Sequence, residues 1–385
     1  MDAKQATRSI IEGSRDKLVD LSHRIHATPE LGFEEERSSE WVASALADGG
    51  LDVEGGICDL PTAFVARAGT GPLHIGICAE YDALPGIGHA CGHNLIAASA
   101  VGAGLALASV ADDLGITVSV FGTPAEEGGG GKILMLDRGA FQGVHAAMMV
   151  HPAPLDMVEA HPLAVSHFEV RFSGKCAHAS ATPQLGVNAA DAMTVSQVGI
   201  GLLRQHMPNR CQIHGIVTKG GDAPNVVPEE TVGRWYVRSK SLAQLENFEP
   251  RVHRCFEAGA LATGCELEIQ PQSKPYSEFQ NDLGLAARYR ENALAIGRQF
   301  PDPSKLGNIE TGSTDMANLS LAIPSIHPMM GIDSLPAVNH QPEFAAHCAK
   351  PLADAALVDA AVAMAWTVID IAGDQAERRR LIAGP

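Results

Sequence analysis

The stretch LHIGICAEYDALP at residues 73–85 combines a strand pattern with a polar end. Residues 73–78 form an apolar run of the kind that predicts a short buried strand. The carboxylates Glu80 and Asp82 follow directly where this strand ends. In an open α/β sheet, ligands bind beyond the carboxyl ends of the strands. The stretch therefore predicts both a buried sheet and a candidate site at its edge.

The flanking sequence continues this alternation of helix and strand patterns. A run rich in Ala, Gly and Ser at 95–111 is slightly short for a membrane span of roughly 20 residues and favours a buried helix. Strand patterns occur at 62–67, 116–121 and 146–150, and helix patterns at 10–27, 34–46 and 132–138. Such alternation is typical of a mostly parallel sheet covered by helices, which places the chain in the α/β class.

The middle of the chain has a different order of strand and helix patterns. Strand patterns at 168–172, 212–218, 230–237 and 266–270 alternate with helix patterns at 188–204 and 242–262. This β-α-β-β-α-β order predicts a ferredoxin-like α+β domain. After this segment the patterns of the first part of the chain return, with helices at 284–298 and 352–371. We therefore predict a first domain made of 1–164 plus 277–385, with 165–276 inserted into it.

Composition and charge narrow the class of function. The 385 residues are 45% hydrophobic and 19% charged, which excludes a disordered or collagen-like chain. A formal net charge of −17 argues against nucleic acid or an anionic membrane as partner, because both require a basic surface. The eight cysteines form no CxxC pair, and the N-terminal residues lack the apolar core of a signal peptide. We therefore expect a cytoplasmic protein.

Metal-capable residues gather in five short segments. Cys91 and His93 lie two residues apart around a glycine, and Glu126 and Glu127 precede four glycines. Cysteine, histidine and carboxylate together suit Zn²⁺ or another first-row divalent ion. The remaining segments are 78–85 at the end of the first strand, 148–152 with His151, and 338–342 with His340.

Each segment also has a plainer interpretation when it is taken alone. Cys91 can be a buried structural cysteine beside a capping His93, because cysteine is common in cores. The pair Glu126 and Glu127 can be a solvated acidic loop. A lone histidine such as His151 or His340 can be an ordinary core or surface residue. The residues by themselves leave these alternatives open.

Seven ordered motifs spread along the chain carry a family resemblance. They are HATPELGF at 26–33, EYDALP at 80–85, GHACGHN at 88–94, GTPAEE at 122–127, GKCAHAS at 174–180, STDM at 313–316 and NH at 339–340. Together they resemble the M20 metallopeptidase/amidohydrolase family. Within it, the nearest match is the aminoacylase-like M20D branch, which includes aminobenzoyl-glutamate hydrolase-like and dipeptidase members.

The resemblance implies roles for particular residues. It implies a two-metal site that holds two divalent ions, Zn²⁺ or Mn²⁺ first and Co²⁺ or Ni²⁺ as alternatives. It also implies Glu126 as the general base toward a metal-activated water that attacks an amide carbonyl. The positions that match the metal ligands of the branch are Cys91, His93, Glu127, His151 and His340.

For the inserted domain, the resemblance implies a lid that also forms a homodimer. His178 matches a histidine that reaches the active site of the neighbouring subunit in dimeric relatives. Asn225 and Arg238 match lid positions that contact substrate, Arg238 through a substrate carboxylate. The plainer alternatives are a capping or surface histidine for His178 and a surface ion pair for Arg238.

Two positions depart from the family pattern. Asn94 replaces the aspartate that is usual after the Cys-Gly-His motif, and Glu80 stands where the wider family often has a histidine ligand. Both departures favour the dipeptidase-like members of the branch.

The sequence thus predicts an enzyme that hydrolyses an amide bond in a small N-acyl amino acid, aryl-amide or dipeptide. The first rival is a non-catalytic ligand-binding or regulatory subunit of the same fold. A degenerate member of that kind is expected to lose the base or a ligand, and all these positions are intact here. The second rival is a metal-free hydrolase with Cys91 as its nucleophile, which would resist chelators.

Overall fold

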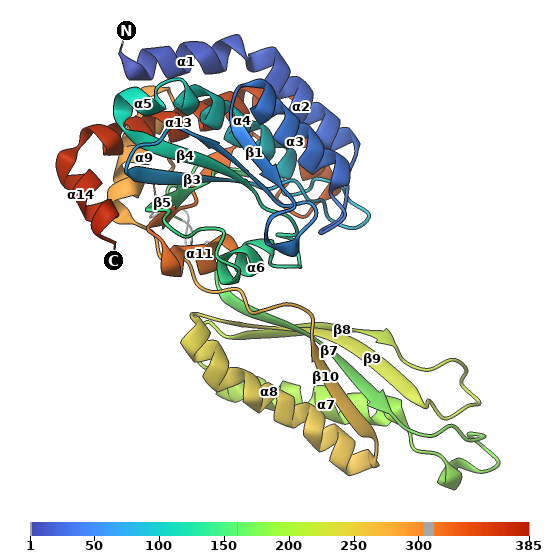
Figure 1. The fold of residues 1–385 in the computed structure, drawn as a ribbon. Helices are drawn as coiled ribbons and strands as arrows, with labels where there is room; N and C mark the ends of the chain where they lie inside the picture. Colours follow the sequence, from blue (N-terminus) through green and yellow to red (C-terminus); the bar gives the residue numbers. More distant parts are fainter. Residues whose placement is uncertain (1, 160, 303–311, 385) are drawn as a thin grey trace. The chain divides into compact units, whose positions relative to one another are not determined.

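The structure of the chain, a computed structural model, describes residues 2–159, 161–302 and 312–384. The chain divides into two compact units (Figure 1). The first comprises Met1–His161 and Phe279–Pro385, and the second is Pro162–Glu278. The second unit is an insertion in the sequence of the first, and its bounds lie within three residues of the predicted 165–276.

A mixed sheet forms the centre of the first unit. Its strands β3, β4, β5 and β11 are parallel, whereas β2 runs antiparallel to β4 and β1 antiparallel to β2. Within the described residues the strand order is β1 (Asp52–Gly55), β2 (Phe64–Ala68), β4 (Ile116–Gly122), β3 (Leu73–Ala79), β5 (Ala146–Met148) and β11 (Ser325–Ile326). A separate short sheet pairs β6 (His151–Ala153) with β12 (Met329–Gly331) in parallel. The predicted α/β class with a mostly parallel sheet is confirmed.

Helices cover both faces of this sheet, as Figure 1 shows. On one face lie α3 (Glu36–Asp48), α4 (His93–Ala108), α9 (Leu283–Ala295) and α13 (Pro351–Gly373). Outside them, α1 (Ala3–Gly13) packs on α4 and α13, and α2 (Arg15–Ala27) packs on α3 and α4. The other face packs against α6 (Gly131–Asp137) and α11 (Met316–Ala322). The short helices α5 (Ala111–Leu114), α12 (Pro342–His347) and α14 (Gln375–Ala383) complete this unit.

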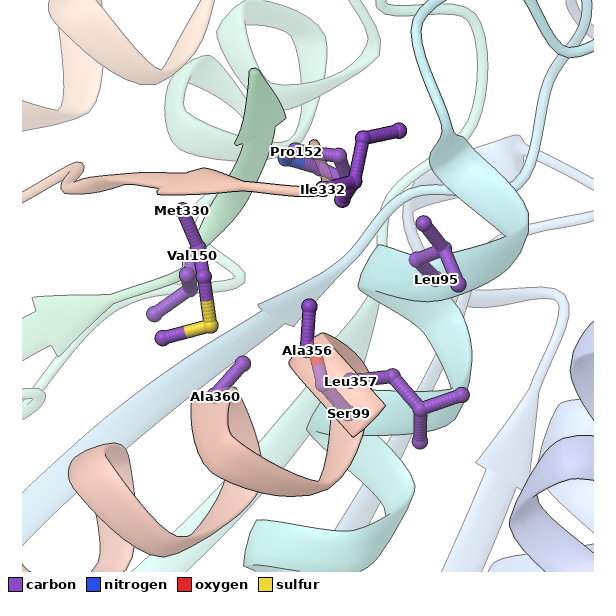
Figure 2. Close-up of a pocket in the computed structure, with 9 residues that line it drawn as sticks. All are labelled: Leu95, Ser99, Val150, Pro152, Met330, Ile332, Ala356, Leu357 and Ala360. Carbon is purple, nitrogen blue, oxygen red and sulfur yellow. The ribbon is translucent and has the colours of Figure 1, made fainter. Parts of the chain in front are cut away.

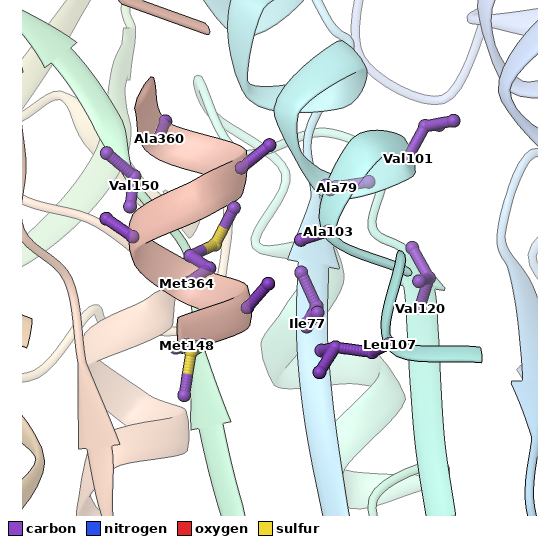
Figure 3. Packing of buried hydrophobic residues seen from close by; sticks show 14 of the residues in the cluster. Ile77, Ala79, Val101, Ala103, Leu107, Val120, Met148, Val150, Ala360 and Met364 are labelled. Carbon is purple, nitrogen blue, oxygen red and sulfur yellow. The ribbon is translucent and has the colours of Figure 1, made fainter. Parts of the chain in front are cut away.

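The small residues of α4 explain its central position. A Cβ atom added at Gly104 would lie 2.5 Å from the Val120 side chain, and one added at Gly102 would lie 2.9 Å from Leu18. The helix can therefore approach both the sheet and α2 closely. Figure 3 shows the resulting contact between α4, α13 and the buried strands. The predicted buried helix at 95–111 is this element.

The long helix α13 is also a core element. Its length and composition pass the test for a membrane span, but 78% of its most apolar window is buried inside the structure. Below its N-terminal half lies a small apolar pocket between α4 and α13 (Figure 2). Pro152 and Leu95, which neighbour the candidate ligands His151 and His93, line this pocket. Apolar packing therefore supports the candidate site from beneath.

The second unit has the predicted β-α-β-β-α-β order. Its described strands are β7 (Ala164–Ser173), β8 (Gln212–Lys219), β9 (Glu230–Ser239) and β10 (Glu266–Pro271), in the sheet order β10-β7-β9-β8 with all neighbours antiparallel. The helices α7 (Ala189–Leu203) and α8 (Leu242–Thr263) share an apolar core with one face of this sheet. Because side chains alternate along a strand, Arg234, Tyr236 and Arg238 of β9 lie on the opposite face from the buried Trp235 and Val237.

One local prediction was wrong, and several short strands were not predicted. The segment 10–27 is not one helix, because α1 ends at Gly13 and α2 starts at Arg15, with Ser14 between them. Edge strand β1 was not predicted, since Asp52–Gly55 is short and largely exposed and gives no apolar pattern.

Packing at the centre of the sheet predicts a large stability effect for Ile77→Ala. Ile77 is fully buried in β3, and an isoleucine-to-alanine change in a core costs about 2–5 kcal/mol. We expect a clear fall in the melting temperature measured by circular dichroism. The matched control is Leu352→Ala on the exposed part of α13, where 57% of the residue is accessible. Equal losses in both variants would contradict this assignment of the core.

Candidate metal centre

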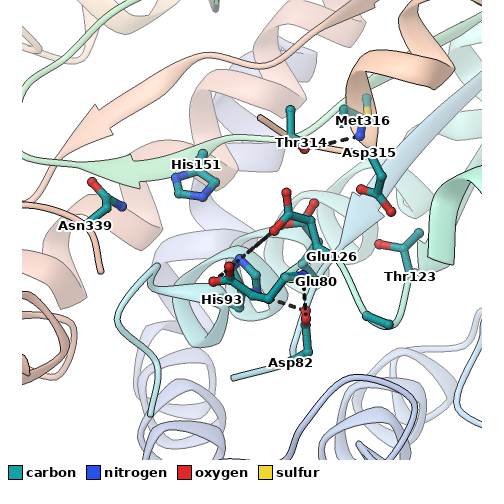
Figure 4. A network of polar contacts seen from close by, with 12 residues as sticks. Glu80, Asp82, His93, Thr123, Glu126, His151, Thr314, Asp315, Met316 and Asn339 are labelled. Atoms are coloured by element: carbon teal, nitrogen blue, oxygen red, sulfur yellow. Dashed lines mark hydrogen bonds and ion pairs between the residues drawn. The ribbon is translucent and has the colours of Figure 1, made fainter. Parts of the chain in front are cut away.

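The candidate residues of the first unit meet at one edge of its sheet. Glu80 and Asp82 follow β3, Glu126 follows β4, and His151 comes soon after β5. Since these strands are parallel, their carboxyl ends lie together. Figure 4 shows the side chains of these residues pointing into one cluster.

The predicted ligands fall into two overlapping groups. Cys91, His93 and His151 place one potential ligand atom each within 4.8 Å of one another, and so do Cys91, Glu127 and His340. Cys91 belongs to both groups. The structure therefore brings all five predicted ligand positions together, although they come from four separate segments of the chain.

Backbone contacts hold the ligand segments in place. Gly92 precedes α4 with a φ of 76°, a left-handed conformation that glycine adopts without strain. This turn brings Cys91 back toward the start of the helix at His93. The backbone N–H of His340 donates to the carbonyl oxygen of Ala90 at 2.9 Å, which fixes His340 beside Cys91. His340 itself is exposed.

Hydrogen bonds orient two of the imidazoles. His93 Nδ1 lies 3.0 Å from Asp82 Oδ1, and His151 Nδ1 lies 2.7 Å from the carbonyl oxygen of Pro152. Both partners are acceptors, so each Nδ1 carries the proton and each Nε2 can present a lone pair. A partner of this kind is typical of metal-binding histidines. The other oxygen of Asp82 accepts the backbone N–H of Glu127 at 2.9 Å, so one carboxylate braces both segments.

A buried charge cluster adjoins these groups. The ammonium of Lys132 lies 2.6 Å from Glu80 Oε1 and 2.6 Å from Asp315 Oδ1, and all three side chains are inaccessible to solvent. The second oxygen of Glu80 lies 3.4 Å from His93 Nε2. Glu80, His93 and Glu126 also place one polar atom each within 4.8 Å of one another. Lysine thus balances part of the negative charge of the site.

Burial and the neighbouring carboxylates shift the pKa values of the groups in the site. Burial, together with the carboxylates of Glu80 and Glu127, raises the pKa of Glu126 well above its ordinary value. Burial and the nearby glutamates likewise raise the pKa of the Cys91 thiol. The pKa of His93 is raised despite its burial, because Asp82, Glu80 and Glu127 surround it. A cation in this cluster would favour the ionised thiolate and carboxylates.

The two departures from the family pattern have structural explanations. Asn94 Nδ2 donates to Ser22 Oγ at 2.8 Å and to the carbonyl oxygen of Cys348 at 3.0 Å, so this side chain anchors the start of α4. Glu80 belongs to the lysine cluster described above.

The other three predicted site residues lie in the second unit. His178 and Val226 form a bridge, and the carbonyl oxygen of Asn225 accepts the backbone N–H of Ala179 at 2.9 Å. His178 Nδ1 lies 3.2–3.3 Å from the N–H groups of two following residues, which leaves the proton on Nε2. Arg238 donates from Nε to His214 Nε2 at 3.1 Å.

Several polar residues of the site had no role predicted from the sequence. Asp82, Lys132 and Asp315 were present in or beside the motifs, but their partners lie far apart in the sequence. His327 follows β11, and its ring centroid is 5.4 Å from that of His151. Neither of its ring nitrogens has a hydrogen-bond partner among the residues that the structure describes. No strand was predicted at 325–326, so the sequence patterns gave no signal for His327.

An α/β sheet with cysteine, histidine and carboxylate donors at its strand ends forms a candidate metal centre, of a kind that metal-dependent hydrolases use. Residues 76–364 match the family model described as peptidase family M20/M25/M40, and the chain belongs to this family. The resemblance inferred from the motifs is thereby confirmed.

Known proteins of this family resemble the chain over most of its length. It is 34% identical to the mouse Xaa-Arg dipeptidase, over 96% of this chain and 88% of the relative. It is also 34% identical to one of the subunits of the Escherichia coli p-aminobenzoyl-glutamate hydrolase, over 80% of this chain and 66% of the relative. A Bacillus subtilis structure described as a dinuclear metal binding peptidase of the M20 family has a TM-score of 0.69 at 23% identity, covering 94% of this chain and 99% of its own. The chain is therefore an enzyme, a hydrolase of the M20 family.

Because Asp82 holds both His93 and the backbone of Glu127, we expect Asp82→Asn to bind metal more weakly. His93 and the Glu127 backbone donate to different oxygens of Asp82, and asparagine replaces one of these oxygens with an NH2 donor, so one of the two hydrogen bonds is lost. Loss of such a supporting partner typically costs 10–100-fold in metal affinity. Isothermal titration with Zn²⁺ measures this change. Asp52→Asn on the exposed strand β1 is the control. An unchanged Zn²⁺ affinity in Asp82→Asn would show that Asp82 does not support the ligands His93 and Glu127.

Proposed function

We propose that this protein hydrolyses the amide bond of a small dipeptide or N-acyl amino acid with the help of two divalent metal ions. The observation that carries the proposal is the convergence of two donor groups that share Cys91, immediately beside the carboxylate of Glu126. Such a set combines ligands with a carboxylate that is not itself a proposed ligand and that can move a proton.

The donor set fits two ions of the zinc or manganese type. One group offers a thiol and two imidazoles, and the other offers a thiol, a carboxylate and an imidazole. His93 Nε2 has no hydrogen-bond partner among the described residues although it is buried, which supports a ligand role. When bound, the ions would activate a water molecule and polarise the scissile carbonyl. Zn²⁺ and Mn²⁺ are the first choices, and Co²⁺ and Ni²⁺ are alternatives.

Glu126 is the proposed general base. It lies 3.8 Å from His93 Nε2, and only 8% of its side chain is exposed. A buried carboxylate beside the reacting groups can take the proton of the attacking water and return it to the leaving amine. Burial keeps bulk water from competing for this proton transfer.

The substrate class follows from the relatives and from charge. The mouse relative, which matches 96% of this chain, is named for dipeptides with a C-terminal arginine. The formal net charge of −17 attracts a cationic substrate at long range and disfavours the anionic aminobenzoyl-glutamate. We therefore place dipeptides with a basic C-terminal residue first, ahead of aryl-amides and N-acyl amino acids.

The second unit is proposed to act as a lid and as the surface of a homodimer. Strand β8 is an edge strand with exposed Ile216 and Val217, and α7 exposes Val195, Val198 and Leu202 at helical spacing. An exposed edge strand and an exposed apolar stripe are both surfaces that a second copy can cover. His178 would then donate from Nε2 to the developing oxyanion in the partner's site, while Asn225 and Arg238 hold the substrate.

A substrate panel with chelator controls tests the function itself. We expect the Zn²⁺- or Mn²⁺-loaded protein to hydrolyse Ala-Arg or Ala-Lys with a higher kcat/KM than aminobenzoyl-glutamate or N-acetyl amino acids. EDTA should abolish turnover, and added metal should restore it. Turnover that survives EDTA would instead support the thiol nucleophile, and no turnover of any amide would support the non-catalytic alternative.

We expect replacement of the proposed base to lower the turnover rate without weakening metal binding. Glu126→Gln keeps the size of the side chain but cannot accept a proton, so kcat should fall by roughly 10²–10⁴-fold. Zn²⁺ binding measured by titration should stay within about threefold of wild type, because Glu126 is not a proposed ligand. A near-normal kcat would assign the base to another residue.

Mixing two inactive variants tests whether His178 acts across the dimer. Neither Glu126→Gln nor His178→Ala is expected to turn over substrate at a useful rate. A mixed dimer would contain one site with both residues intact, so mixing should restore up to about a quarter of the wild-type rate if subunits exchange freely. A mixture that stays inactive although exchange is verified by native mass spectrometry would place His178 in its own subunit's site.

A further inference from the structure

Ala125, the residue immediately before the proposed base, has an unusual backbone conformation. Its φ is 56°, in the left-handed region that residues with a Cβ atom rarely occupy. The turn that it makes sends the chain from the end of β4 into the segment that carries Glu126 and Glu127. The carbonyl oxygen of Ala125 accepts the N–H groups of Gly129 and Gly130 at 3.0 Å and 2.9 Å. One side of this residue is therefore held by the glycine turn.

The other side is held by a carboxylate from a distant part of the sequence. Glu35 Oε1 accepts the backbone N–H of Ala125 at 2.8 Å, and Glu35 Oε2 accepts the hydroxyl of Thr62 at 2.9 Å. Glu35 is completely buried. Its environment raises its pKa to about 7, mainly through burial and then through the charge of Asp82. Such a group is costly to bury, so its position calls for an explanation.

The Glu35 carboxylate does not cap its own helix, α3. Glu35 stands at the N-terminal boundary of α3, but its side chain makes no capping hydrogen bond there. Glu30 supplies the cap instead, because its carboxylate accepts the N–H groups of Arg37 and Ser38 at 3.1 Å and 2.9 Å. Apart from its own backbone N–H, the Glu35 carboxylate is thus directed toward Thr62 and Ala125.

Close packing leaves Ala125 little freedom to move elsewhere. A Cβ atom added at Gly32 would lie 2.9 Å from the Ala125 Cβ, and one added at Gly129 would lie 2.7 Å from it. Gly32 belongs to the same segment as Glu35. The segment 30–36 therefore contacts the turn both by packing and by a hydrogen bond.

We propose that Glu35 is a positioning residue, which holds Ala125 in its left-handed turn and thereby aims Glu126 and Glu127 into the metal centre. This inference rests on the proposed function for its catalytic consequence only. Glu35 does not touch the reacting atoms, and it acts through the backbone of Ala125.

The test compares Glu35→Met, Glu35→Gln and Ala125→Gly. Methionine fills the same space without accepting a hydrogen bond, so Ala125 can leave the left-handed region. We expect Glu35→Met to lower both kcat for Ala-Arg and the affinity for Zn²⁺ by about tenfold, with KM changed less than twofold. Glutamine keeps a carbonyl acceptor, so Glu35→Gln should remain within about threefold of wild type in both measurements.

The double variant distinguishes positioning from a general loss of core packing. Glycine occupies the left-handed region without strain, so Ala125→Gly in the Glu35→Met background should recover at least about threefold of the lost affinity and kcat. The matched control is Glu30→Ala, which removes the cap of α3. It should lower the melting temperature without changing kcat more than twofold, and Ala125→Gly should not rescue it.

Three results would overturn the proposal. They are wild-type Zn²⁺ affinity in Glu35→Met, a double variant no better than Glu35→Met, and a crystal structure of Glu35→Met with Ala125 still left-handed and both glutamates unmoved. If Glu35→Met does not fold, a tenfold loss in the folded Glu35→Gln overturns it equally. The Zn²⁺ titration and the crystal structure do not depend on turnover, so an inactive wild-type enzyme would refute the proposed function without deciding this inference.

Discussion

The burial of negative charge is the constraint on which the rest of this structure depends. Glu80, Asp82, Glu126 and Asp315 are almost completely inaccessible, and 11% of the Glu127 side chain is exposed. Lys132 is the cation that contacts two of them. Five carboxylates against one lysine leave about four negative charges, and an ionised Cys91 would add a fifth, so the cluster favours bound cations. Without such ions, the carboxylates and the Cys91 thiol would have to retain protons.

The scaffold satisfies this constraint by aligning strand ends. Parallel strands β3, β4 and β5 bring their polar ends to one edge, and the short turn at Gly92 returns the start of α4 to the same place. The apolar faces of α4 and α13 then exclude water from beneath. A rigid sheet with fixed hydrogen-bond partners can hold like charges that would separate in a mobile loop.

Local sequence was sufficient to predict most strands, most helices and the two-unit order, because apolar runs and turn residues act over short distances. The short strands β1, β6, β11 and β12 were not predicted. The ligand positions were predicted from several short motifs considered together, since Cys91 or His340 alone has an ordinary alternative. The partners of these residues could not be predicted. Glu35 and Ala125 are 90 positions apart, and Lys132 and Asp315 are 183 apart, so only the tertiary fold reveals that they meet. The antiparallel direction of β2 was likewise not encoded in its apolar pattern.

The metal content of the protein tests the central claim most directly. We predict that protein purified with excess Zn²⁺ or Mn²⁺ and then desalted contains two divalent ions per chain, measured by inductively coupled plasma mass spectrometry. We also predict that Cys91→Ser, the change at the residue shared by both donor groups, reduces the content of both ions. A content near zero in the wild type, or two ions retained in full by Cys91→Ser, would contradict the two-ion centre.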